Sequence, residues 1–130
     1  YALGPSEVIS EMVKLQQYTF VCAPSFAQFA GLKALDSDIT QFRDDYRTKR
    51  DMIYNGIKDK FKTIRPGGAF YIFPEAPGKN GDEFVKKAIE NNLIIPGSVF
   101  SERNSHFRIS YASTNDAIKQ GIDILNSLAG

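Results

Sequence analysis

The sequence predicts an α+β fold in which helices cover one face of a small sheet of short strands. Apolar residues recur at helical spacing up to about residue 60 and again in two later segments. The runs between those later segments are short, aromatic and β-branched, which is typical of strands. Helices packed on one face of a small sheet would bury every one of these apolar stripes.

The composition is that of one soluble globular domain. Of the 130 residues, 42% are hydrophobic and 24% are charged, with 16 basic against 15 acidic side chains. The densest basic cluster, residues 43–50, is interleaved with aspartates, so we expect a solvated helix face and no nucleic-acid partner. Cys22 is the only cysteine and no apolar run could cross a bilayer, so we expect a cytoplasmic protein with no membrane partner.

Two helices are predicted at the start of the chain. Pro5 suits the first turn of a helix whose apolar spacing continues to Leu15, and the pattern breaks from Gln16. Ser25 can cap a second, shorter helix that reaches Ala34.

The longest helix is predicted from Asp36 or Asp38 to about Lys60. One of its faces carries four apolar residues at helical spacing: Phe42, Tyr46, Ile53 and Ile57. Two ion pairs are expected on the other side: Asp45 with Lys49, and Arg47 with Asp51.

A hairpin is the natural reading of the next segment. FKTIRP and AFYIFP are two strand-like runs separated by Gly67-Gly68. Pro66 and Pro74 limit both strands to a few residues.

The remaining elements follow in order. Asn80–Glu83 has the spacing of a capping box for a helix that ends at Asn91-Asn92. LIIPGSVF begins as a buried strand and turns at Pro96-Gly97, and HFRISYA is a strand with strict alternation. Residues 113–116 cap a closing helix whose inward residues are Ile118, Ile122, Leu125 and Leu128.

HFRISYA carries the chemically informative side chains. His106, Arg108 and Ser110 point to one side of the strand, and Phe107 and its apolar partners point to the other. An arginine in the middle of a short strand needs an anion, and from composition alone a carboxylate of the same fold is the favoured partner. His106 has neither a second metal ligand nor a nucleophile at a recognisable spacing, so we expect a surface or supporting role and no metal site.

Six stretches together resemble the end of the class I/II aminotransferases of the pyridoxal-phosphate fold type I, and most closely the aspartate aminotransferase-like branch. In order, they are YALGPSEVISEM, PSFAQFAGLKAL, YRTKRD, RPGGAFYIFP, NNLIIPGSVF and HFRISYAST. They follow the family's order and spacing over essentially the whole chain. The resemblance implies an enzyme, a homodimer when complete, that moves an amino group from an amino acid to a 2-oxo acid.

The resemblance also implies roles for individual residues. Arg108, in the R-x-S-Y-A motif, would hold the α-carboxylate of the substrate, and this reverses the preference for a structural ion pair. Pro96, Gly97 and Phe100 would form part of the active-site wall, and Ser110 would lie behind it.

No catalytic or cofactor-binding residue is expected within this chain. The family's pyridoxal phosphate forms a Schiff base with a lysine in a Ser-Lys or similar context, and none of the ten lysines here follows a serine. The lysine and the aspartate that pairs with the pyridine nitrogen would precede residue 1. We therefore expect the chain alone to bind no cofactor and to be inactive.

The resemblance divides the chain in two. Residues 1–37 would be the incomplete tail of the large cofactor-binding domain, and residues 38–130 the C-terminal small domain with a long bridging helix at 38–60. Five apolar side chains of the first part would lack their usual cover: Val8, Met12, Leu15, Phe20 and Phe26.

Two other classes of protein stay open at this point. The same tail occurs in regulators that fuse a DNA-binding head to a ligand-sensing aminotransferase-like domain without enzymatic activity. A stand-alone interaction domain of the same architecture is disfavoured, because a scaffold does not need the Arg108 and PGSVF motifs.

Overall fold

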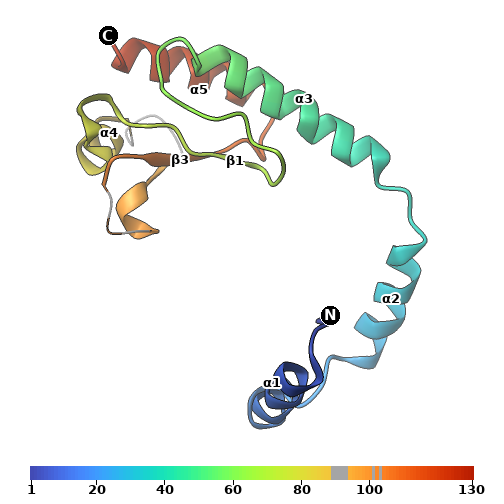
Figure 1. Ribbon diagram of the computed structural model, residues 1–130. Coiled ribbons are helices and arrows are strands. Elements are labelled where there is room, and N and C mark those ends of the chain that lie inside the picture. The colour runs from blue at the N-terminus through green and yellow to red at the C-terminus, as the bar shows by residue number, and fades with distance from the viewer. Residues whose placement is uncertain (89–93, 101, 103) are drawn as a thin grey trace. The chain divides into compact units, whose positions relative to one another are not determined.

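The computed structural model describes residues 1–88, 94–100, 102 and 104–130, and these form two units (Figure 1). The first unit is Tyr1–Asp38 and the second is Ile39–Gly130. The assignment of the first unit to a larger cofactor-binding domain stays a prediction.

The first unit consists of two helices, α1 (Ser6–Thr19) and α2 (Ser25–Leu35). A proline precedes each of them, and its fixed φ suits entry into the first turn. α1 continues beyond Gln16, where the apolar pattern predicted a break. Ser25 is the first helical residue rather than a side-chain cap, because Pro24 takes the capping position.

The side chains of the first unit remain in solvent. No residue of α1 or α2 is buried. The five apolar side chains predicted to lack cover are 48–78% exposed. Within this unit, local helical hydrogen bonds rather than a core hold the backbone.

The second unit confirms the predicted α+β fold class. Its regular elements are α3 (Thr40–Ile57), β1 (Tyr71–Ile72), a 3-10 turn at Pro77–Lys79, α4 (Gly81–Ala88), β2 (Ile94–Pro96), a 3-10 turn at Gly97–Val99, β3 (Phe107–Ser110) and α5 (Asn115–Leu128). In the described residues the strands form one sheet in the order β1-β3-β2, and both pairings are antiparallel.

One hydrophobic core joins the strands to the three helices. Phe61, Phe84 and Phe107 pack ring against ring at its centre, with centroids 4.7–5.7 Å apart. α3 and α5 run side by side (Figure 1). A Cβ on Gly56 would lie 2.6 Å from Ile122 Cδ1, so a larger residue there would displace the Ile122 side chain.

α3 is shorter than predicted, and it buries only the end of its apolar stripe. It spans Thr40–Ile57 rather than 38–60. Ile53 and Ile57 are buried against α5 and the sheet, whereas Phe42 is 68% exposed and Tyr46 is 37% exposed. The stripe therefore extends beyond the surface that the core of this unit can cover.

One of the two predicted ion pairs on α3 is present. Lys49 Nζ lies 2.7 Å from Asp45 Oδ2, as predicted. Arg47 pairs with Asp44 at 3.2 Å rather than with Asp51, which two other arginines engage.

The predicted hairpin around Gly67-Gly68 is wrong. Residues 61–66 form no strand, and β1 pairs with β3, with Tyr71 opposite Ser110. The backbone bonds of the second run go to β3 and its flanks: Tyr111 N donates to Phe70 O, and Phe107 N donates to Pro74 O. In the first run, Lys62 O accepts from Glu75 N.

Both later helices begin with a side-chain cap. Asn80 Oδ1 accepts from Glu83 N at 3.2 Å, as the capping-box spacing predicted. Thr114 Oγ1 accepts from Ala117 N at 3.3 Å at the start of α5. The predicted end of α4 at Asn91-Asn92 lies outside the described residues.

Candidate functional site

The alternation of β3 places Arg108 on the face of the sheet away from the core. Phe107, Ile109 and Tyr111 are 0%, 7% and 1% exposed, which confirms the predicted apolar face. Arg108 is half-buried on the opposite face. It lies on the central strand, so elements from both sides of β3 can reach it.

Two aromatic rings flank the Arg108 guanidinium. Its Cζ lies 4.3 Å from the centroid of Tyr71 and 4.4 Å from that of Phe100. Tyr71 is opposite Ser110 in the ladder, so it shares the face of Arg108 and lies on the diagonal from it. Phe100 comes from the other side of β3, after the 3-10 turn that follows β2.

Arg108 is not neutralised within this part of the chain. Among the described residues, no carboxylate lies within ion-pair distance of its guanidinium, although nine such pairs occur elsewhere. The structural ion pair favoured by composition alone is therefore not found there.

Gly97 lets the turn that carries Phe100 lie directly against β3. Its N–H donates to His106 O at 2.7 Å, and an added Cβ would lie 2.6 Å from the same oxygen. Glycine is thus needed for a close approach of two backbones. Pro96, opposite Phe107, is the last residue of β2.

The other polar side chains of this face have local partners. His106 stacks on Phe73, with ring centroids 5.3 Å apart and planes 9° apart, and its Nδ1 is 2.8 Å from Ser105 Oγ. Ser110 Oγ accepts from Ala112 N at 3.3 Å.

Tyr71 is a site residue that the sequence did not reveal. It stood in a run expected to pair with residues 61–66, and only the true pairing with β3 brings it to Arg108. Its position on the outward face of a strand beside β3 would have indicated contact with Arg108. That position can be recognised only when the pairing of the strands is known.

A half-buried ion-pair network supports the loop that leads to Tyr71. Asp51 accepts from Arg50 Nε at 2.8 Å and from both Nε and Nη2 of Arg65, at 3.0 and 2.9 Å. The hydrogen bond from Arg50, followed by that from Arg65, lowers the pKa of Asp51 despite partial desolvation. Further along the loop, the Tyr111 hydroxyl donates to Ala69 O at 2.8 Å, and burial raises the pKa of that hydroxyl.

A family profile described as Aminotransferase class I and II matches residues 1–125. The chain belongs to this family.

Individual aminotransferases show the same relationship. The chain is 39% identical over 128 residues to a probable aspartate aminotransferase of Methanocaldococcus jannaschii, covering 94% of this chain and 34% of that protein. An aromatic aminotransferase structure from Pyrococcus horikoshii matches with a TM-score of 0.86 and 28% identity, over 95% of this chain and 36% of that one. An aspartate aminotransferase structure from Thermotoga maritima matches with a TM-score of 0.83 and 26% identity, over 93% and 32% of the two chains. The chain therefore spans about a third of the length of these relatives.

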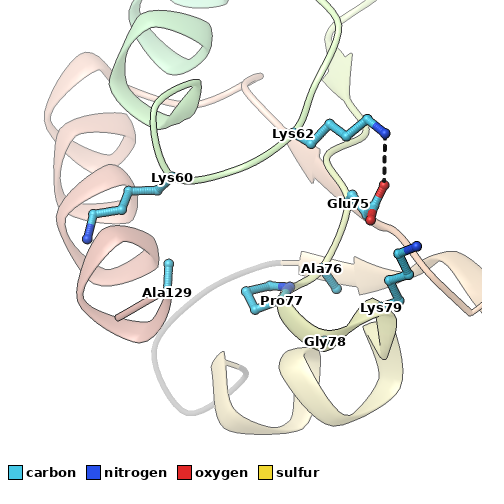
Figure 2. Close-up of a pocket in the computed structure, with 8 residues that line it drawn as sticks. All are labelled: Lys60, Lys62, Glu75, Ala76, Pro77, Gly78, Lys79 and Ala129. Atoms are coloured by element: carbon cyan, nitrogen blue, oxygen red, sulfur yellow. Dashed lines mark ion pairs between the residues drawn. The ribbon is translucent and has the colours of Figure 1, made fainter.

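A separate depression of about 450 Å³ lies elsewhere on the second unit of this aminotransferase chain (Figure 2). Lys62 Nζ lies 3.8 Å from a Glu75 carboxylate oxygen at its rim. Lys60 points away from that pair and donates to Gly130 O (Figure 2). Two of the lysines that line the depression, Lys60 and Lys62, thus have local partners.

Two further features are absent from the described residues. In the ranges 1–88, 94–100, 102 and 104–130, no three His, Cys, Asp or Glu side chains are placed to share a metal ion. Within the same ranges, no helix is both long and apolar enough to span a bilayer.

Proposed function

We propose that this chain is the C-terminal portion of a pyridoxal-phosphate-dependent aminotransferase, in which Arg108 binds the α-carboxylate of the amino-acid substrate. The observation that carries the proposal is the guanidinium between Tyr71 and Phe100, with no carboxylate partner among the described residues. Such a group is a cation prepared for an incoming anion. The complete protein would move an amino group from an amino acid to a 2-oxo acid.

The chemistry of a guanidinium suits this role. Two of its N–H groups can donate parallel hydrogen bonds to one carboxylate, which fixes the orientation of the substrate as well as its affinity. Orientation matters because the bond broken at Cα must stand perpendicular to the cofactor ring. Arg108 would thus bind and orient the substrate, with Gly97 and Phe100 as part of the wall beside it.

The residues present do not fit the cofactor itself. Pyridoxal phosphate supplies the electron sink of the reaction when bound. The groups that touch the Arg108 side chain are two aromatic rings, and neither can form a Schiff base or neutralise a phosphate. We therefore propose that residues outside this chain hold the cofactor and that the chain alone does not transaminate.

The broader setting follows from the same proposal. Residues 1–37 would belong to the large domain, and the uncovered apolar side chains there would be covered by the rest of a cytoplasmic homodimer. The relatives described above are named as aspartate and aromatic aminotransferases. Those names favour an amino-acid substrate of one of these classes over the non-enzymatic regulator.

The test is substitution of Arg108 in the full-length enzyme that contains this chain. Each charged hydrogen bond contributes about 1.5–3 kcal/mol. Arg108→Leu is therefore expected to raise KM for amino-acid donors by about a hundredfold or more, measured by steady-state transamination. Arg47→Leu removes a cation from an exposed pair on α3 and is the control, with kinetics expected to be unchanged. Unchanged kinetics of Arg108→Leu across several donors would remove Arg108 from the site.

A further inference from the structure

The two rings beside Arg108 come from separate elements and meet at one side chain. Tyr71 lies in β1, and Phe100 ends the 3-10 turn after β2, so the rings approach β3 from its two sides. We propose that Tyr71 and Phe100 are positioning residues that hold the guanidinium of Arg108 with its N–H edge toward the substrate carboxylate. This inference rests on the proposed function of Arg108.

An aromatic restraint differs in kind from a carboxylate restraint. A ring interacts with a guanidinium through its face, whereas a carboxylate occupies the N–H donors at its edge. A structural carboxylate would therefore compete with the substrate for the same hydrogen bonds. Two rings limit the motion of the side chain and leave those donors available for the substrate.

Each ring is itself fixed by its own neighbours. Tyr71 is held by its place opposite Ser110 and by the Phe70 ring, whose centroid is 4.4 Å away. Phe100 N donates to Gly97 O at 2.8 Å, and the Phe73 ring stands edge-on to Phe100 at 6.5 Å. Such support is what a binding group needs in order to be in place before its ligand arrives.

The first experiment removes each ring in the full-length holoenzyme. A half-buried cation–π contact is strong enough that Tyr71→Leu and Phe100→Leu should each raise KM for amino-acid donors by about three- to tenfold. The effect on kcat should be smaller, because the carboxylate is gripped alike in the ground and transition states. Tyr71→Phe and Phe100→Tyr keep the ring and should keep KM within about twofold of wild type.

A matched control separates positioning from general loss of packing. Tyr54→Leu removes a ring that also lies under a cation, Lys58 Nζ at 6.0 Å, but on α3 and away from Arg108. It should leave KM unchanged. If Tyr71→Leu does not fold, Phe100→Leu carries the same test, because Phe100 is 49% exposed and leaves the core intact.

The decisive measurement is a double-mutant cycle with Arg108→Leu. If the rings act through Arg108, their removal in the Arg108→Leu background should change KM no further. Two outcomes would overturn the positioning role and leave the proposed function standing. One is an equal rise in KM when a ring is removed from wild type and from Arg108→Leu. The other is an unchanged KM in both ring variants while Arg108→Leu is impaired. Wild-type KM in Arg108→Leu itself would overturn the proposed function.

Discussion

Both units of this chain contain helices, and the helices of the two units differ in what they bury. α2 of the first unit carries four large apolar side chains, Phe26, Phe29, Leu32 and Leu35, and each is at least 64% exposed. α5 of the second unit buries Ile118 and Leu125 almost completely. Because a helix of about a dozen residues is marginal alone, packing rather than apolar content decides which helix is stable.

The largest expected contrast comes from removing one phenylalanine from each unit. Phe107 is fully buried between Phe61 and Phe84, so Phe107→Ala should lower the free energy of unfolding by about 3–5 kcal/mol. Phe26 is 78% exposed, and Phe26→Ala should change the free energy of unfolding by no more than about 0.5 kcal/mol. Urea unfolding followed by circular dichroism measures both. Equal losses would show that the first unit has a core of its own.

Replacing one glycine in each unit by alanine should change stability in opposite directions. Gly56→Ala in α3 drives a Cβ into Ile122 and should cost about 1–3 kcal/mol, seen as a lower Tm. Gly31 in α2 has no atom within 4 Å of the added Cβ, so Gly31→Ala should stabilise its helix by up to about 1 kcal/mol. Far-UV circular dichroism would detect the gain as extra helicity. A loss of helicity in Gly31→Ala would mean that α2 packs against something at that position.

The smallest expected effect is a loss of stability of the second unit at acidic pH. The pKa of Asp51 is lowered in the folded state, so its contribution to stability is present above the unfolded pKa of about 3.9 and is lost as the pH falls through the folded value. Asp51→Asn should therefore lower Tm at pH 7, and the difference from wild type should vanish at strongly acidic pH. Glu11→Gln, which breaks an exposed pair with Lys14, should leave Tm unchanged at both pH values. A constant Tm difference for Asp51→Asn at every pH would contradict this assignment.

The sequence predicted the features that depend on local periodicity. β3 and its two faces follow from strict alternation, and the start of α4 follows from the spacing of Asn80 and Glu83. Arg108 was likewise placed on the outer face from its position in the strand. Each of these features is decided by residues within a few positions of one another.

Features that depend on distant pairing were not predicted. The run around Tyr71 pairs with β3, almost forty positions away, rather than with its neighbour in sequence. The stack on Arg108 follows from that register, and the network of Arg50, Asp51 and Arg65 joins a helix to a loop. Short runs limited by prolines give too weak a local signal to select such partners.

The proline that ends β2 also affects how this sheet meets other molecules. The N–H of Gly97 bonds to His106, so in the alternating antiparallel ladder the nitrogen of Pro96 faces away from β3, toward the side of β2 on which no other described strand pairs. Proline at this position removes no hydrogen bond between β2 and β3. It leaves the outer side of β2 without a backbone N–H donor at that position. A strand from another molecule that approached this side of β2 would lack one of the hydrogen bonds needed to extend the sheet.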